Sequence, residues 1–294
     1  MDMFKKIYVE VTNRCNLSCS FCHQSQRPKT FMKAADFADV LAKIKDHTRF
    51  IYLHVLGEAM FHPEFERLLE ISHRAGLQVN LSTNGTLLSR NRGAILASPA
   101  VRQVNVSLHS HSPSDGPVME EYLGEILSFS KEARKRSIWL NLRLWDIRDL
   151  REEGRHPAGS SAGQIGRYLR AAFSLPELFF TDLAAGESRT LAPGLFLSRE
   201  KQFTWPHAAA SELSDRGTCR GLRDHIAILV DGTVVPCCLD AEADIALGNI
   251  HRQSLEEILG CPRACRMREG LRDQRLVEAL CRRCDYRLRF LSKP

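Results

Sequence analysis

Three closely spaced cysteines near the amino terminus constrain this chain more than any other feature. Cys15, Cys19 and Cys22 follow the spacing Cys-x3-Cys-x2-Cys, and no further cysteine occurs before Cys219. Three thiolates this close together can bind three irons of a [4Fe–4S] cubane, which normally takes four cysteine ligands. We therefore expect one iron to lack a protein ligand, and an open coordination position is typical of catalytic metal sites. A zinc site or a disulfide loop is the alternative.

A predicted strand leads into these cysteines. Residues 5–11 (KKIYVEV) are rich in β-branched and aromatic side chains, which favours a buried strand. The cysteines then fall at its carboxyl end, where α/β proteins place ligands and catalytic groups.

The rest of the first half alternates between strand-like and helix-like runs. This alternation predicts a parallel sheet built from βαβ units. The predicted strands are residues 50–55, 78–82, 103–108 and 138–144, with a sixth near 195–199. The predicted helices are residues 33–46, 63–75, 87–97 and 118–136, and a shorter one lies near 165–174.

The strand, the cysteine triad and Phe21 directly before the last cysteine resemble the radical SAM superfamily. The resemblance covers roughly residues 4–145. It implies an α/β fold, a partial (β/α)6 parallel barrel, in which Cys15, Cys19 and Cys22 hold a catalytic [4Fe–4S] cluster. It also implies that S-adenosyl-L-methionine chelates the free iron beside Phe21. Reductive cleavage of this cofactor then yields a 5′-deoxyadenosyl radical, which abstracts hydrogen from a substrate.

The same resemblance implies further contacts with S-adenosyl-L-methionine. Gly57 and Glu58 match two positions of the family's Gly-Gly-Glu motif, which contacts the methionine amine, whereas Leu56 and Ala59 depart from it. Because Glu58 follows a predicted strand, we expect Glu58→Ala to weaken cofactor binding more than folding. The other candidate contacts lie at the ends of later predicted strands: Ser82, Asn84, Ser107 and Arg143. The alternatives are an Asn-Gly turn at Asn84 and an ordinary solvent-facing or paired arginine at Arg143.

A second cysteine set occupies the end of the chain. The run HIAILV-DG-TVVPCC predicts a β-hairpin with an Asp231-Gly232 turn. Together with the Gly232-x4-Cys237 spacing and the LEEIL helix at 255–259, the set resembles the twitch domain, a shortened SPASM domain with an auxiliary cluster. This resemblance implies a second [4Fe–4S] cluster held by Cys219, Cys237, Cys281 and Cys284. Four thiolates suit zinc equally well, and metal binding by Cys238, Cys261 or Cys265 stays open.

Composition limits the remaining possibilities. The chain has 294 residues, 44% of them hydrophobic, a formal charge of +6 and a pI near 8.8. No apolar run reaches the ~20 residues that cross a bilayer, and ten cysteines without a signal peptide favour metal binding in a cytoplasmic protein. The arginine-rich stretch 263–289 contains many acidic residues, so it predicts a solvated helix face, and nucleic acid is not expected as a partner.

Three domains are predicted. Residues 1–150 form the radical SAM core, 151–217 an insertion or linker with the remaining barrel elements, and 218–294 a small cysteine-rich α+β domain with the auxiliary cluster.

The predicted function is an oxidation of an unidentified substrate, assisted by the auxiliary cluster and supplied by an electron donor such as flavodoxin or ferredoxin. The substrate is a small molecule or a peptide. Peptide maturation of the SPASM type is the first alternative, although Cys15 begins early for a chain with an amino-terminal peptide-binding domain. A non-enzymatic zinc or electron-transfer module is the second.

Overall fold

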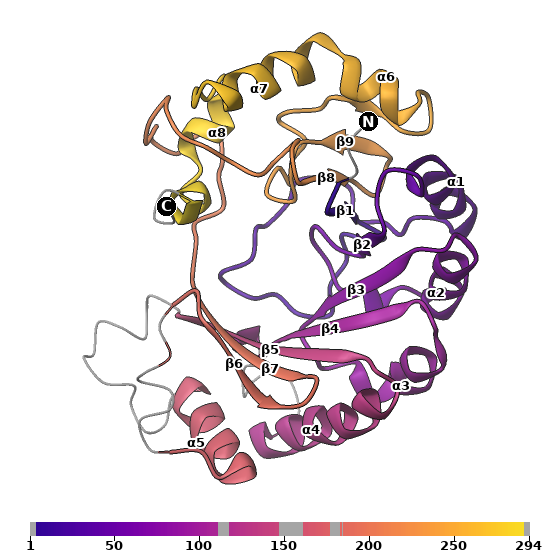
Figure 1. Cartoon of the computed structure of the whole chain (residues 1–294), viewed down its shortest axis with the longest axis vertical. Helices are drawn as coiled ribbons and strands as arrows, with labels where there is room; N and C mark the ends of the chain where they lie inside the picture. The colour runs from indigo at the N-terminus through magenta and orange to yellow at the C-terminus, as the bar shows by residue number, and fades with distance from the viewer. Residues whose placement is uncertain (1–3, 111–117, 147–160, 177–182, 184, 291–294) are drawn as a thin grey trace. The chain divides into compact units, whose positions relative to one another are not determined.

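The computed structural model describes residues 4–110, 118–146, 161–176, 183 and 185–290. The chain divides into two compact units (Figure 1). The first unit contains residues 1–79 and 203–294, and the second contains residues 80–202. The two cysteine sets, although two hundred residues apart in sequence, therefore belong to the same unit.

The first unit combines the amino-terminal strands and helices with those of the carboxyl-terminal region. Its strands are β1 (Lys6–Val9), β2 (Phe50–Tyr52), β8 (His225–Ile228), β9 (Thr233–Val235) and β10 (Gly248–Asn249). Its helices are α1 (Ala34–Ile44), η1 (Ala59–Phe61), α2 (Phe65–Arg74), α6 (Leu255–Gly260), α7 (Pro262–Arg272), α8 (Ala279–Arg283) and η5 (Tyr286–Phe290). The strand order is β10-β9-β8-β1-β2, with β1 parallel to both β2 and β8.

Local sequence explains why these helices form where they do. In α1, Phe37, Val40, Leu41 and Ile44 repeat at helical spacing and are all fully buried. Helix α2 ends just before Gly76, whose φ of +73° is the left-handed conformation that glycine adopts at helix ends. Helix α6 begins with a capping box, in which Ser254 and Glu257 satisfy each other's backbone N–H groups.

The predicted hairpin of the second cysteine set is confirmed. Strands β8 and β9 pair antiparallel around a turn at Asp231-Gly232. Gly232 has φ +84°, and a Cβ there would lie 2.3 Å from the His251 ring, so only glycine fits. The turn is further fixed because the Asp231 carboxylate accepts hydrogen bonds from the backbone and hydroxyl of Thr233, each at 3.0 Å.

The second unit is a further piece of sheet with its helices. Its strands are β3 (Gln78–Thr83, which begins at the boundary), β4 (Val101–Ser107), β5 (Trp139–Asp146), β6 (Ser188–Ala192) and β7 (Leu195–Lys201). Its helices are α3 (Leu88–Ala97), η2 (Leu108–Ser110), α4 (Met119–Lys135) and α5 (Ser161–Phe173). The strand order is β3-β4-β5-β7-β6, with β4, β5 and β7 parallel and β6 antiparallel to β7.

The α/β class is confirmed, with a parallel-dominated sheet and a cysteine-rich carboxyl-terminal region. The sixth strand predicted near residues 195–199 is β7, and it is preceded by an antiparallel partner that the sequence did not indicate. Parts of the predicted insertion or linker at 151–217, residues 151–160, 177–182 and 184, lie outside the described residues. The domain boundaries after residues 150 and 217 stay a prediction.

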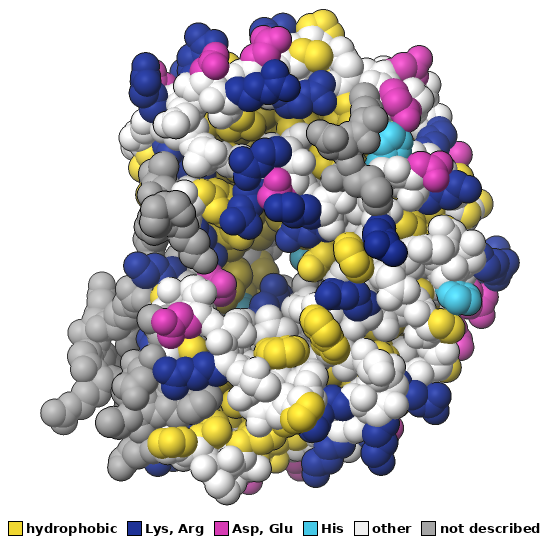
Figure 2. Space-filling model, viewed as in Figure 1, with side chains coloured by type: hydrophobic (Ala, Val, Ile, Leu, Met, Phe, Trp, Pro, Cys, Tyr) yellow, Lys and Arg dark blue, Asp and Glu magenta, His cyan; other side chains and the backbone are white. Residues whose placement is uncertain are grey.

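Searched over its described residues, the chain has no helix long and apolar enough to cross a membrane. Figure 2 shows Lys and Arg side chains mixed with Asp and Glu on the visible face of the molecule. In the arginine-rich stretch, Arg263 pairs with Glu278 at 2.7 Å, as expected for a solvated helix face.

Candidate functional site

The cysteine triad lies on a loop of the first unit that is closed at its base by hydrogen bonds. Thr12 Oγ1 donates to the carbonyl of Thr30 at 2.7 Å. The Asn13 side chain accepts from Thr30 N at 2.8 Å and donates to the carbonyl of Pro28 at 2.9 Å. These bonds make residues 14–29 a closed loop at the carboxyl end of β1, as the sequence predicts.

The three thiols of the triad lie near one another. A hydrogen bond with Cys19, burial and the charges of Cys19 and Cys15 raise the pKa of Cys22. Cys15 and Cys22 are exposed and Cys19 is partly exposed. Three accessible thiols whose negative charges repel are suited to binding cationic iron, which stabilises the thiolate form.

Gly57 packs directly against the start of this loop. Its φ is +74°, and a Cβ there would lie 2.4 Å from the Thr12 carbonyl oxygen and 2.7 Å from that of Arg14. Glu58 N donates to the same Arg14 oxygen at 2.9 Å. The requirement for glycine therefore comes from a close approach of two backbones, which the sequence could not reveal. A cofactor contact at Gly57 stays a prediction.

Glu58 is not an exposed loop residue. Its side chain is 2% exposed and accepts a hydrogen bond from Met60 N at 3.2 Å, which caps η1. Glu58→Ala therefore removes a buried capping acceptor and should cost stability. The expectation that it weakens cofactor binding more than folding stays a prediction.

The buried carboxylate of Glu10 joins the triad loop to two other segments, at Leu56 and at Val230. Glu10 is fully buried, and its Oε1 accepts from Arg27 Nη2 at 2.7 Å and from Leu56 N at 3.2 Å. Its Oε2 accepts from Val230 N at 3.0 Å. Burial lowers the pKa of Arg27, but the Glu10 carboxylate raises it, and on balance the pKa is higher than usual. The one acidic residue in the run KKIYVEV was the only sequence signal, and the partners of Glu10 could not be identified from it.

The triad loop also contacts the segment that follows Cys237 and Cys238. Arg27 Nε donates to the Ala241 carbonyl at 2.7 Å, and His23 Nε2 lies 2.7 Å from Glu242 Oε1. His23 directly follows Cys22, the last triad cysteine. The two cysteine-bearing segments of the first unit are therefore linked by two polar contacts.

The candidate contacts of the second unit lie on its strands. Ser107 on β4 is opposite Arg143 on β5, which is in turn opposite Ser198 on β7. Arg143 Nη2 donates to Ser107 Oγ at 2.8 Å. Ser82 Oγ and Ser198 Oγ are among the buried side-chain atoms of the described residues that have no hydrogen-bond partner in the chain. Buried polar atoms of this kind are suited to a polar ligand.

Asn84 serves a turn. Its Oδ1 accepts from Thr86 N at 2.9 Å and from Thr86 Oγ1 at 2.6 Å, and its own carbonyl accepts from Tyr122 OH at 2.7 Å. This is the structural alternative that the Asn-Gly dipeptide indicated, and a cofactor role for Asn84 stays a prediction.

His109 follows β4, and the sequence did not reveal its surroundings. Its ring stacks on Trp145 with centroids 4.4 Å apart, and Nδ1 lies 3.2 Å from the Arg143 carbonyl oxygen. Burial, helped by the Arg143 charge, lowers the pKa of His109 to about 3. Because a carbonyl only accepts hydrogen bonds, Nδ1 carries the proton and Nε2 is an acceptor.

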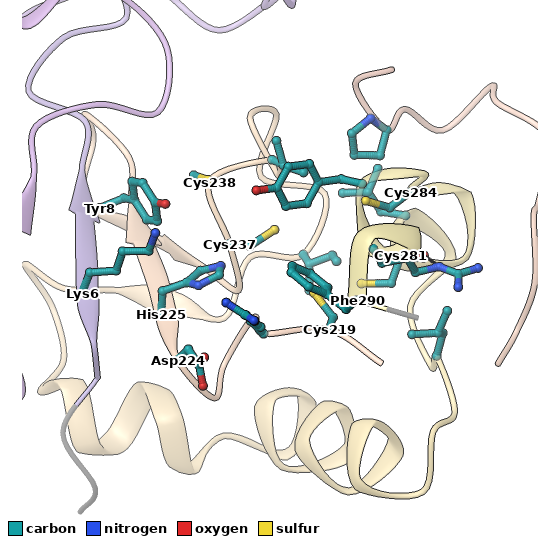
Figure 3. Close-up of a pocket in the computed structure, with 18 of the residues that line it drawn as sticks. Lys6, Tyr8, Cys219, Asp224, His225, Cys237, Cys238, Cys281, Cys284 and Phe290 are labelled. Carbon is teal, nitrogen blue, oxygen red and sulfur yellow. Dashed lines mark hydrogen bonds between the residues drawn. The ribbon is translucent and has the colours of Figure 1, made fainter. Parts of the chain in front are cut away.

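The four predicted auxiliary ligands line one cavity of the first unit (Figure 3). Burial, with the charges of Cys238, Cys219 and Cys281, raises the pKa of Cys237. Burial and the charges of Cys219 and Cys284 likewise raise the pKa of Cys281, and burial raises that of Cys284 to about 11. The four thiols come from the end of the hairpin, from α8 and its C-cap, and from the segment before β8, and all line this cavity.

Cys238 lies beside this cavity but points toward Tyr8 (Figure 3), whose side chain forms a hydrogen bond with it. Cys261 is the N-cap of α7, where its Sγ accepts from Ala264 N at 3.4 Å. Cys265 contacts Arg268 at 3.6 Å. These contacts do not place the three thiols in the four-cysteine set.

All ten cysteines are free thiols. In the described part of the chain, no three His, Cys, Asp or Glu side chains converge as ligands of a single preformed metal ion. The two ligand sets therefore stay proposals, supported by the proximity of their thiols.

Comparison with known protein families assigns the chain. The family model of the radical SAM superfamily matches residues 9–155, which is half of the chain. The chain belongs to the radical SAM superfamily. A second model, SPASM, an iron-sulfur cluster-binding domain, matches residues 219–285. The radical SAM domain binds a [4Fe–4S] cluster and S-adenosyl-L-methionine, and the SPASM domain binds additional iron–sulfur cluster material.

Curated relatives match over shorter stretches. The tungsten-containing aldehyde ferredoxin oxidoreductase cofactor-modifying protein of Pyrococcus furiosus is 32% identical over 93 residues, covering 29% of this chain and 25% of that protein. The PqqA peptide cyclase of Streptomyces rochei is 29% identical over 112 residues, covering 37% of this chain and 30% of that protein. The chain thus spans less than a third of either relative's length.

Solved structures agree with the radical SAM fold over nearly the whole chain. BtrN in complex with AdoMet and 2-DOIA has a TM-score of 0.62 at 17% identity, covering 97% of this chain and 94% of that one. SuiB of Streptococcus suis bound to S-adenosylmethionine has a TM-score of 0.57 at 14% identity, covering 97% and 71%. At these identities the likeness establishes the fold alone, and it supports the predicted partial barrel with a cysteine-rich appendage.

Proposed function

We propose that this protein cleaves S-adenosyl-L-methionine reductively and uses the resulting radical to modify a peptide. The observation that carries the proposal is the triad loop, because it presents three thiols beside the Leu56–Glu58 segment within the domain matched by the radical SAM model. When bound, the cluster and cofactor supply one electron and a 5′-deoxyadenosyl radical for hydrogen abstraction.

The chain's own residues have distinct roles in this proposal. Cys15, Cys19 and Cys22 bind three irons. Glu10 and Arg27 hold their loop in place, and Gly57 allows the Leu56–Glu58 segment to approach it. Glu58 would supply a carboxylate acceptor for the methionine amine. Phe21, Ser82, Ser107 and Arg143 stay predicted contacts of the cofactor, as the family resemblance implies.

A peptide is the favoured substrate because one of the two curated relatives is named a peptide cyclase. The sequence favoured oxidation of an unidentified substrate and held peptide maturation as the alternative. Both reactions begin with the same hydrogen abstraction, and a crosslink formed by loss of two hydrogens is itself an oxidation. The electron donor we propose is a flavodoxin or ferredoxin, and the cytoplasmic location stays a prediction.

Cofactor cleavage gives the first test. Anaerobically reconstituted protein, incubated with S-adenosyl-L-methionine and dithionite, should form 5′-deoxyadenosine, and Cys15→Ala, Cys19→Ala and Cys22→Ala should each abolish it. Cys265→Ala is the matched control, because its thiol lies outside both proposed ligand sets. Cleavage retained in any triad variant would contradict the assignment.

The substrate class is tested with fractions of a host cell extract. Peptides and small molecules are separated by size, and each fraction is added to the reconstituted protein. Stimulated 5′-deoxyadenosine formation and a mass change in the peptide fraction support the proposal. The same response in the small-molecule fraction alone would refute the peptide assignment and leave the radical reaction intact.

A further inference from the structure

The cavity that contains the auxiliary cysteines has a second, cationic wall (Figure 3). It encloses about 350 Å³ within the first unit. Cys219, Cys237, Cys281 and Cys284 lie on one side, and Lys6, Tyr8 and His225 face them from strands β1 and β8 on the other. A cluster held by the four thiols would therefore lie opposite these strands.

Strand register directs Lys6 toward the cavity. Lys6 is opposite His225, and residues two apart on a strand share a face, so Lys6 and Tyr8 project to the same side. Lys6 Nζ lies 5.1 Å from the centre of the Tyr8 ring and 4.9 Å from that of Tyr52. Two aromatic rings thus hold the ammonium at the wall by cation–π attraction.

The charges around the cavity are unbalanced. Of the described residues that line it, Asp224 alone is acidic, and that carboxylate is bonded to Lys5 Nζ at 3.1 Å and to Arg223 Nε at 3.0 Å. Four thiolates on a [4Fe–4S]²⁺ core make a dianion.

We propose that Lys6 is the counter-ion of the auxiliary cluster and raises its reduction potential. Reduction adds a negative charge to a partly buried group, so a fixed cation nearby favours the reduced state. Net charge and surroundings are the means by which proteins set cluster potentials. A raised potential makes the cluster a better electron acceptor. The proposal rests on the four-cysteine ligand set given above.

The test is an anaerobic redox titration followed by electron paramagnetic resonance, together with iron content. Lys6→Met keeps the length of the side chain and removes the charge, whereas Lys6→Arg keeps the charge. Lys45→Met is the matched control, because Lys45 is an exposed lysine at the end of α1 that does not line the cavity. We expect Lys6→Met to lower the reduction potential of the auxiliary cluster by at least about 59 mV, which is tenfold in the equilibrium constant of a one-electron reduction. Lys6→Arg and Lys45→Met should remain close to wild type.

Each outcome decides the proposal. If Lys6→Met assembles no second cluster while Lys6→Arg does, the requirement for charge is supported. If both variants lose the cluster, packing rather than charge is responsible and the proposal is wrong. A second cluster whose potential is unchanged in Lys6→Met also refutes it and leaves the ligand set intact. Wild-type protein with no second cluster signal would overturn the ligand set, and this inference with it.

Discussion

Glu10→Gln is the change that most directly tests how the triad loop is held. Glu10 is fully buried and accepts from Arg27, Leu56 N and Val230 N. Glutamine keeps the size of the side chain but has one acceptor oxygen, and its NH2 group faces a donor. The change also leaves the Arg27 guanidinium, 14% exposed, without its carboxylate.

The magnitude follows from this geometry. Removing one partner of a buried ion pair costs about 3–5 kcal/mol, because the remaining charge stays desolvated. Domains of this size lose roughly 2–4 °C in melting temperature per kcal/mol. We therefore expect the melting temperature to fall by roughly 6–20 °C.

Melting of anaerobically purified protein measures the effect, and hydrogen exchange locates it. Exchange should accelerate at the Leu56 and Val230 amides, which lose their acceptor. Glu70→Gln is the matched control, since Glu70 is 57% exposed and its pair with Arg74 is on the surface. In Glu10→Gln/Arg27→Met the unpaired charge is gone, so part of the lost stability should return. A melting temperature for Glu10→Gln within 2 °C of the Glu70→Gln control, an order-of-magnitude threshold set by about 1 kcal/mol, would refute the reasoning.

Three further predictions follow from single residues of the first unit. Gly57→Ala should lower the free energy of unfolding by roughly 1–2 kcal/mol or more, the strain of a forced left-handed residue, and should lower the iron bound by the triad, because its Cβ would lie 2.4 Å from the Thr12 oxygen. Gly93→Ala is the control, because the space around its Cβ is open, and equal melting temperatures of the two variants would contradict the prediction. Glu58→Gln keeps an acceptor for Met60 N, so it should lose less stability than Glu58→Ala, but it should raise the dissociation constant of S-adenosyl-L-methionine roughly ten- to a hundredfold. Calorimetric titration of cluster-loaded protein measures this constant, and an unchanged value would mean that Glu58 only caps η1. Burial raises the pKa of Asp240 from 3.8 to about 6, although two backbone N–H donors oppose the rise, so the stability contributed by the protonated carboxyl is present below pH 4 and is lost as the pH rises through 6. Between pH 4 and pH 7 the free energy of unfolding of Asp240→Asn should therefore rise by about 3 kcal/mol relative to that of wild type, as measured by denaturant unfolding, and parallel pH profiles would rule this out.

Much of this protein could be predicted from the sequence because the motifs that indicate its fold and its cysteine sets are local. The triad spacing, the Asp231-Gly232 turn and the spacing from Gly232 to Cys237 each lie within a few residues, and local spacing determines local geometry. Periodicity likewise predicted most strands and helices, including β7 near its observed position. Family membership followed from the same short motifs, and the family models confirm it.

Only the tertiary structure determined what surrounds these motifs. Glu10 and Val230 are 220 residues apart, yet one carboxylate oxygen joins them. The sequence gives no sign that Lys6 differs from other lysines at strand ends. The pairing of β1 with β8 places it in the cavity with the auxiliary cysteines. The sequence around Glu58 indicates a loop residue, whereas the structure buries its side chain and uses it to cap η1. Contacts of this kind depend on which distant segments pair and on which face is buried, and neither follows from the sequence around a single residue.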